Sequence, residues 1–279
     1  MAVLRIVSLL IGFLSAWLAN ASAETVRING TGSAILSVKR VLEPYMTAHS
    51  QDSYETTLPP MGSGGAIKAL LEGHLDIALS GRPLKKEEQA ANLQQFWLGQ
   101  SPFVVVVPKQ VALQNITLAQ VADIYAGRQK RWPDGSRIRV ILRPIADADT
   151  ALLNSISPAM AEALKLAHAN RQPGAALADT DIDLVSMIDK VPDSFGTVSL
   201  SMVLAEPRAI KALSLDEVEP TLANLENHRY PLSKPLYLIM RHDASPTLRA
   251  LVAYLQSDEG KQRMVGQGFT SQQPRRLSP

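Results

Sequence analysis

Hydrophobic residues follow two alternating spacings along most of the chain. Short apolar runs typical of strands, such as residues 25–28 and 138–142, are followed by a loop and then by apolar residues at helical spacing. The apolar run at residues 103–108 suits a strand that is buried on both faces or that crosses between two lobes. This alternation of strands and helices predicts an α/β fold with mainly parallel sheets.

Three strand–loop–helix units place small hydroxyl or glycine residues where a helix begins. In the clearest one, the sequence Gly-Ser-Gly-Gly at residues 62–65 lies between an extended run at 54–58 and a helix that ends near Gly73. The other two units have their loops at residues 29–33 and 143–149. The start of a helix carries unpaired N–H groups and a partial positive charge, so it attracts anions. The three loops therefore predict a receptor for an oxyanion.

The remaining elements are predicted from capping residues and from apolar spacing. Thr117 and the Ser-Pro pair at 157–158 are expected to open helices, and Pro44 is expected to kink or end the helix that contains it. Further elements are expected as helices near residues 181–190, 245–256 and 257–265, and as strands near residues 195–198, 209–213 and 236–240.

Residues 1–23 have the features of a secretory signal peptide. Arg5 is the only charged residue in this stretch, residues 6–18 are mostly apolar, and the Ala-Ser-Ala at 21–23 suits a cleavage site. The apolar stretch is too short for a good membrane span, and the alternative is an uncleaved N-terminal anchor. Because the chain has no cysteine, it has no lipoprotein attachment site, no disulfide and no thiol chemistry. We expect a protein of the periplasm, secreted through a cleaved signal peptide.

The composition after this cleavage is that of a large, nearly neutral globular protein. Removing residues 1–23 leaves 256 of 279 residues, with 27 basic and 26 acidic side chains and a formal charge of +1. A binder of nucleic acid or of membrane surfaces would need a concentrated basic field, so we expect neither partner. With 46% hydrophobic residues the chain can bury a large core, and we expect a monomer of two lobes. Lobe one would hold residues 24–106 and 235–279, lobe two residues 107–234, with the ligand between them.

Several motifs resemble those of the phosphate-binding subunit of ABC phosphate transporters. They are the loop at 62–65 with the helix start that follows it, the Asp-Ile-Ala-Leu-Ser at 76–80, and the segments at 128–135, 193–197 and 230–237. The resemblance extends over most of the chain after residue 23. It implies a two-lobed type II periplasmic binding-protein fold, which closes by hinge motion around inorganic phosphate or a similar tetrahedral oxyanion. It also implies delivery of that anion to an inner-membrane ABC permease.

The resemblance implies a set of ligand-binding residues as well. The contacts are hydroxyl and backbone N–H donors, one arginine that closes the second lobe onto the anion, and an aspartate that accepts a proton from it. The corresponding residues of this chain are Thr31, Gly32, Ser33, Ala34, Ser63, Gly64, Ser80, Arg143, Asp149 and Thr150.

Two departures from the family pattern bear on the identity of the ligand. Gly81, followed by Arg82, stands where the phosphate binders have an aspartate, and the Ala-Asp-Thr at 148–150 stands where they have Ser-Gly-Thr. Hydrogen phosphate has a P–OH donor that a carboxylate can accept, whereas the same carboxylate repels sulfate, molybdate and tungstate. Either Asp147 or Asp149 supplies the acceptor, or the site favours an anion without a proton. We favour the compensating aspartate.

Two further features allow more than one interpretation. Arg82 is a rim residue, a partner in a salt bridge between lobes, or an anion contact. Asp179, Asp181 and Asp183 alternate as calcium ligands do, but they lack the spacing and the final glutamate of an EF-hand. We therefore interpret these three residues as an acidic cluster at the start of a helix.

Few features of the sequence favour catalysis. A Gly-x-Ser-x-Gly motif is missing, no motif ties a histidine to Ser33 or Ser63, and the five histidines lack a paired metal spacing. We therefore predict a non-enzymatic protein that uses no metal and no other cofactor, and a phosphate-ester hydrolase is the less favoured reading. A periplasmic oxyanion sensor or scaffold without a transport role is the alternative that the sequence leaves open.

Overall fold

The computed structural model describes residues 23–171 and 176–272. The predicted signal peptide, residues 1–23, lies outside these ranges except for its last residue. Within the described ranges, no helix combines the length and the apolar character that crossing a membrane requires.

Eight strands form one sheet in the order β2-β1-β3-β10-β4-β7-β6, with β8 also paired to β4, and β5 and β9 form a separate pair. The strands are β1 (Thr25–Gly30), β2 (Ser53–Thr56), β3 (Ile77–Ser80), β4 (Leu93–Pro108), β5 (Asn115–Ile116), β6 (Arg139–Val140), β7 (Ser194–Ser199), β8 (Ile210–Ala212), β9 (Ser214–Leu215) and β10 (Ser233–Arg241).

The directions of the strands differ from the mainly parallel sheet that the sequence predicts. β1 is parallel to β2 and β3, but β4 runs antiparallel to β10, β7 and β8. The reason is the path of the chain, because β4 leads from the N-terminal part of the fold into its central part and β10 leads back. β4 is also much longer than the predicted strand at 103–108, since it begins at Leu93.

Most helices begin at the residues that the capping pattern indicates. The helices of the described residues are α2 (Gly32–Ala48), α3 (Gly62–Leu71), α4 (Lys86–Gln89), α5 (Leu118–Tyr125), α6 (Ala148–Ile156), α7 (Pro158–Ala169), α8 (Asp181–Lys190), α9 (Leu200–Ala205), α10 (Leu222–Glu226), α11 (Pro246–Gln256) and α12 (Asp258–Gly266). Thr117 caps α5 and Ser157 caps α7 through their hydroxyl groups, as predicted. Pro44 lies inside α2 and does not end it. α6 starts two residues before Thr150 because Asp147 caps it, accepting the N–H of Asp149 at 2.9 Å.

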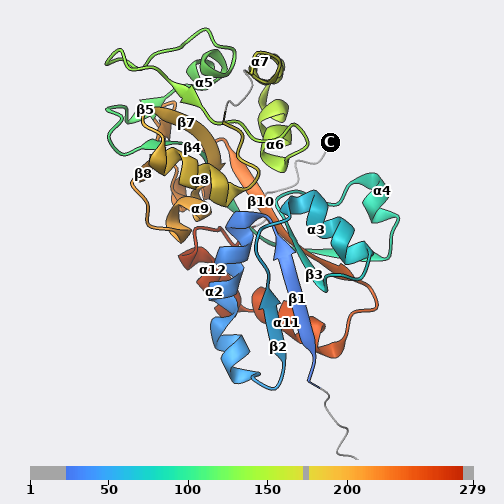
Figure 1. Ribbon diagram of the computed structural model, residues 1–279. Helices are drawn as coiled ribbons and strands as arrows, with labels where there is room; N and C mark the ends of the chain where they lie inside the picture. Colours follow the sequence, from blue (N-terminus) through green and yellow to red (C-terminus); the bar gives the residue numbers. More distant parts are fainter. Residues whose placement is uncertain (1–22, 172–175, 273–279) are drawn as a thin grey trace, which may run out of the picture.

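Buried hydrophobic residues form three clusters. Two of them cover opposite faces of the sheet around β1, β3 and β10, one beneath α2, α11 and α12 and the other beneath α3. The third and largest takes its residues from the stretch between Phe103 and Tyr230 and packs around β4 and β7. We call the elements around the first two clusters the first region, and those around the third cluster the second region. In Figure 1, α2, β1, β2, α3 and α11 lie in the lower part of the molecule and α5, α6 and α7 in the upper part.

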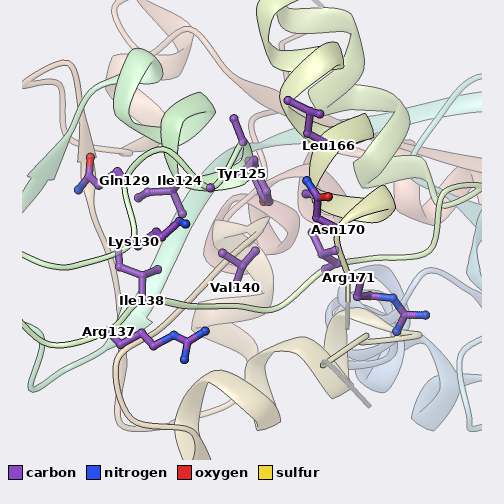
Figure 2. A pocket seen from close by; sticks show the side chains of 14 residues that line it. Ile124, Tyr125, Gln129, Lys130, Arg137, Ile138, Val140, Leu166, Asn170 and Arg171 are labelled. Atoms are coloured by element: carbon purple, nitrogen blue, oxygen red, sulfur yellow. The ribbon is translucent and has the colours of Figure 1, made fainter. Parts of the chain in front are cut away.

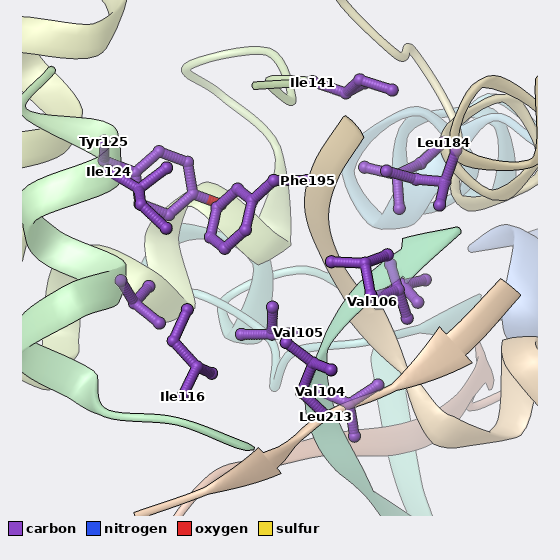
Figure 3. Packing of buried hydrophobic residues seen from close by; sticks show 14 of the residues in the cluster. Val104, Val105, Val106, Ile116, Ile124, Tyr125, Ile141, Leu184, Phe195 and Leu213 are labelled. Atoms are coloured by element: carbon purple, nitrogen blue, oxygen red, sulfur yellow. The ribbon is translucent and has the colours of Figure 1, made fainter. Parts of the chain in front are cut away.

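The valine run of β4 forms the centre of the second region. Val104, Val105 and Val106 are all buried, as expected for a strand covered on both faces. Figure 3 shows them together with Tyr125 and Phe195, whose rings pack edge to face with 5.3 Å between their centroids. β4 thus joins both regions, and β10 begins beside the point where it crosses.

Candidate functional site

The first turn of α2 faces the first turn of α8 across the boundary between the two regions. Thr31 is the N-cap residue of α2, but its hydroxyl does not cap that helix. It donates to Oδ2 of Asp181, the first residue of α8, at 2.7 Å. The backbone N–H of Ser33 donates to the same oxygen at 3.2 Å. A carboxylate from the second region therefore occupies the N-terminus of α2, where the helix attracts an anion.

Two cations lie beside this carboxylate. Nζ of Lys234, in β10, is 3.3 Å from each oxygen of Asp181 and 2.5 Å from Oδ1 of Asp149. Nη2 of Arg143 is 3.7 Å from Oδ1 of Asp181 and 2.8 Å from Oδ2 of Asp147. Nη1 of Arg143 also donates to the carbonyl of Ala178 at 2.9 Å, which fixes the plane of the guanidinium.

We call Arg143, Asp147, Asp149, Asp181 and Lys234 the charged cluster. The side chains of Asp149 and Asp181 are 0% exposed and those of Lys234 and Arg143 are 5% and 6% exposed, so water screens their charges little. With all five groups ionised, three carboxylates face two cations and the cluster has a formal charge of −1. A buried excess charge of this kind favours uptake of a proton.

Asp149 is the carboxyl group of the cluster whose proton affinity rises. Burial is the largest influence and raises its pKa to about 7. The charge of Asp181, and after it that of Asp147, adds to the rise in this pKa, whereas Lys234 and Arg143 act against it. The excess charge of the cluster is therefore relieved at Asp149.

Asp181 behaves in the opposite way. Burial is the largest single influence and acts to raise its pKa. The positive charges of Lys234 and Arg143, together with the hydrogen bonds from Thr31 and Ser33, outweigh burial and hold the pKa well below its ordinary range. The group at the start of α2 is consequently an ionised carboxylate at any pH near neutrality.

The structure brings some of the predicted site residues to this place and directs others elsewhere. Thr31 and Ser33 contact Asp181, Gly32 and Ala34 lie beside them in α2, and Arg143 and Asp149 belong to the charged cluster. Three predicted hydroxyl groups make hydrogen bonds within the first or second region, of which Ser80 and Thr150 donate and Ser63 accepts. The bonds are from Ser80 Oγ to the Arg82 carbonyl at 2.6 Å, from Thr150 Oγ1 to the Pro144 carbonyl at 2.9 Å, and from the Gly81 N–H to Ser63 Oγ at 2.9 Å.

The sequence patterns do not indicate Lys234 or Asp181 as site residues. Asp181 has the pattern of an acidic helix start, and Lys234 lies within the motif at 230–237 without a predicted role. Gly81 was the available signal, because a Cβ at this residue would lie 2.8 Å from Cε of Lys234. The missing side chain at Gly81 thus leaves room for the side chain of Lys234.

A cleft of about 580 Å³ opens beside the charged cluster. The first region contributes the loop at 61–65, which includes Ser63 and Gly64, together with Arg82 and Lys85. The second region contributes residues 144–148, Ala151 and Asp179. Arg82 binds both oxygens of Glu88 at 2.7 and 2.8 Å, so its salt bridge lies within the first region and does not link the two regions.

A second cavity, of about 280 Å³, lies within the second region between α5, β6 and α7. Figure 2 shows Lys130, Arg137 and Arg171 at its edge and the apolar side chains of Ile138 and Leu166 among them. None of the predicted site residues lines it.

Comparisons with known proteins agree with one another. A family model described as a PBP superfamily domain matches residues 18–259. The phosphate-binding protein PstS of Staphylococcus aureus strain USA300 is 21% identical over 254 residues, which cover 83% of this chain and 74% of the relative. A putative phosphate ABC transporter substrate-binding protein with bound phosphate from Clostridium perfringens has a TM-score of 0.77 at 21% identity, and the match covers 89% of this chain and 100% of that one. An ABC-type phosphate transport receptor from Vibrio cholerae has a TM-score of 0.63 at 22% identity, with the same coverage.

Proposed function

The chain belongs to the PBP (periplasmic binding protein) superfamily and has its type II fold, and we propose that it captures phosphate or a related tetrahedral oxyanion for an ABC importer. The resemblance found in the sequence motifs is confirmed by the family match and by the relatives, which include phosphate-binding proteins. In this proposal the chain is secreted to the periplasm, acts there as a monomer without catalysis, and passes its ligand to an inner-membrane permease.

One observation carries the proposal more than any other. The N-terminus of α2 already holds an anionic group, bound by the Thr31 hydroxyl, the Ser33 N–H, Lys234 and, at a greater distance, Arg143. These four kinds of donor are the ones that recognise an oxyanion at a helix start. The cleft lies beside the charged cluster, and Ser63 and Asp147 are among the residues that line it.

We further propose that the two regions act as lobes. Their hydrophobic clusters are separate, and among the described residues the chain passes between them along β4 and at the start of β10. Hinge motion at these two strands would part α2 from α8, since each helix packs on a different cluster. The oxyanion would bind between the parted surfaces.

Asp147 is the acceptor that we propose for a protonated anion. Its side chain is 14% exposed and lines the cleft, whereas Asp149 is fully buried and in contact with Lys234. Of the two aspartates considered from the sequence, Asp147 is thus the one that an anion in the cleft could reach. A carboxylate there favours hydrogen phosphate over sulfate, because sulfate near neutral pH has no proton to donate.

The test is an equilibrium titration of refolded, ligand-free protein with phosphate, sulfate, molybdate and tungstate. We expect saturable binding of at least one of these anions, with phosphate bound more tightly than sulfate. Asp147→Asn should reduce the preference for phosphate, and it keeps an oxygen to cap α6. Failure to bind any of the four anions would refute the receptor function.

A further inference from the structure

We propose that Asp181 is a tethered competitor of the ligand, which occupies the anion position at the start of α2 and sets the affinity of the site. This inference rests on the proposed function of the same site. The Asp181 carboxylate comes from the second region, while Thr31 and Ser33, which bind it, come from the first. The carboxylate therefore bridges the two regions, as a ligand between the lobes would.

The Asp181 carboxylate fills the anion position at the start of α2. A Cβ at Gly32 would lie 3.3 Å from Cβ of Asp181 and 3.3 Å from Cγ1 of Ile182, so α8 packs directly against the first turn of α2. A phosphate ion has no room at this place while the Asp181 carboxylate is there. The Oδ2 atom also uses the two donors, the Thr31 hydroxyl and the Ser33 N–H, that an oxyanion would need.

Charge leads to the same conclusion. With all five groups ionised the charged cluster has a formal charge of −1, and with Asp149 protonated it is neutral, so in neither state does it attract a second anion through its net charge. Without the charge of Asp181 the cluster becomes more positive by one unit, so it is neutral when Asp149 is ionised and carries +1 when Asp149 is protonated. Binding of the oxyanion is thus coupled to departure of Asp181. The free energy of the contact between Asp181 and the start of α2 therefore reduces the free energy gained when the oxyanion binds.

The experiment compares the wild type with Asp181→Asn and Asp181→Ala by isothermal titration calorimetry with inorganic phosphate, at one pH and one ionic strength. The asparagine keeps the volume and removes the charge, and the alanine removes both. Because a hydrogen bond to a charged group contributes about 1.5–3 kcal/mol, the Kd should fall by roughly tenfold or more in each variant, and further in Asp181→Ala.

Asp183→Asn is the matched control. It removes one negative charge from the same helical turn, and its amide oxygen can still accept the Thr180 N–H that Asp183 caps at 3.0 Å. Asp183 does not contact Thr31 or Ser33, so its variant should change the Kd by about twofold at most. Thermal unfolding with and without phosphate gives a second measure, since ligand that binds only the folded state raises the Tm.

The outcomes separate the inference from the proposed function. If the wild type binds phosphate and both Asp181 variants bind it equally well or more weakly, the inference is overturned and the receptor function stands. If only the Asp181 variants bind, the inference is supported and the wild type is not a phosphate receptor. If no folded variant, the wild type included, binds phosphate, sulfate, molybdate or tungstate, both are overturned. Should Asp181→Ala fail to fold, the nearly isosteric Asp181→Asn decides.

Discussion

Lys234 provides the sharpest test of the charged cluster, through its replacement by methionine. The side chain of Lys234 is 5% exposed, and its ammonium lies 2.5 Å from Asp149 and 3.3 Å from Asp181. Lys234→Met keeps the length of the side chain but leaves both carboxylates buried with Arg143 as the remaining cation. Loss of one partner of a buried ion pair costs about 3–5 kcal/mol, because the other charge stays buried without compensation. For a chain of this size that loss corresponds to a decrease in Tm of roughly 6–20 °C.

The loss should also depend on pH. Without Lys234, the pKa of Asp149 loses its strongest lowering influence and rises further above its ordinary value of 3.8. The folded state then holds a proton that the unfolded state has released, so the free energy of unfolding decreases as the pH rises through the raised pKa. The difference between wild type and Lys234→Met should therefore be larger at pH 8 than at pH 6.

Urea denaturation at pH 6 and pH 8 measures both effects. Lys165→Met is the control, since Lys165 is 76% exposed and its pair with Glu162 at 3.4 Å contributes little. The double variant Lys234→Met/Asp149→Asn should recover part of the lost stability, because it also removes the carboxylate left unpaired. A loss below about 1 kcal/mol, or a loss that does not grow with pH, would refute the reasoning.

Three further predictions concern single residues of the site. Arg143→Ala should weaken phosphate binding at least about tenfold in a calorimetric titration, because it removes a buried guanidinium, and unchanged affinity would contradict the placement of the site. Asp149→Asn should gain stability relative to the wild type as the pH rises from 5 to 7, because the raised pKa of Asp149 makes its ionisation in the folded state unfavourable in this range. Urea denaturation measures the difference in the free energy of unfolding between the two proteins. A difference that stays constant with pH would show that Lys234 keeps Asp149 ionised. Gly81→Ala should destabilise the protein by about 1–3 kcal/mol in the same assay, since its Cβ would lie 2.8 Å from Lys234 Cε, whereas Gly64→Ala meets open space and should not destabilise. Equal effects of the two alanines would argue against the close packing at Gly81.

The sequence determined the helices better than the site. Local capping signals predict helices after Thr117 and Ser157, and an acidic start predicts the helix at 181–190. The structure has all three helices. Strand direction was predicted less well, because a hydrophobic run such as 103–108 has the same pattern whichever way its neighbour runs.

The charged cluster could not be assembled from local patterns. Thr31 and Asp181 are 150 residues apart in the sequence, and Lys234 is 53 residues from Asp181. Each of these residues alone has an ordinary explanation, as a helix cap, an acidic helix start or a strand lysine. Of the charged cluster, the sequence predicts Arg143 and, as alternative acceptors, Asp147 and Asp149, and it does so through the family resemblance and not through spacing.

The position of Lys234 at the start of β10 has a consequence for how an anion would find the cleft. Lys234 pairs with Ser101 of β4, at the place where both strands cross between the regions, so it lies at the pivot of the proposed hinge. Asp149 and Asp181 belong to α6 and α8, which would move away with the second region. Opening would thus expose an ammonium group that closure neutralises, and the open cleft would be more positive than the closed one. The electrostatic attraction of the protein for anions would then be greatest in the state that can admit them and smallest once the cleft has closed.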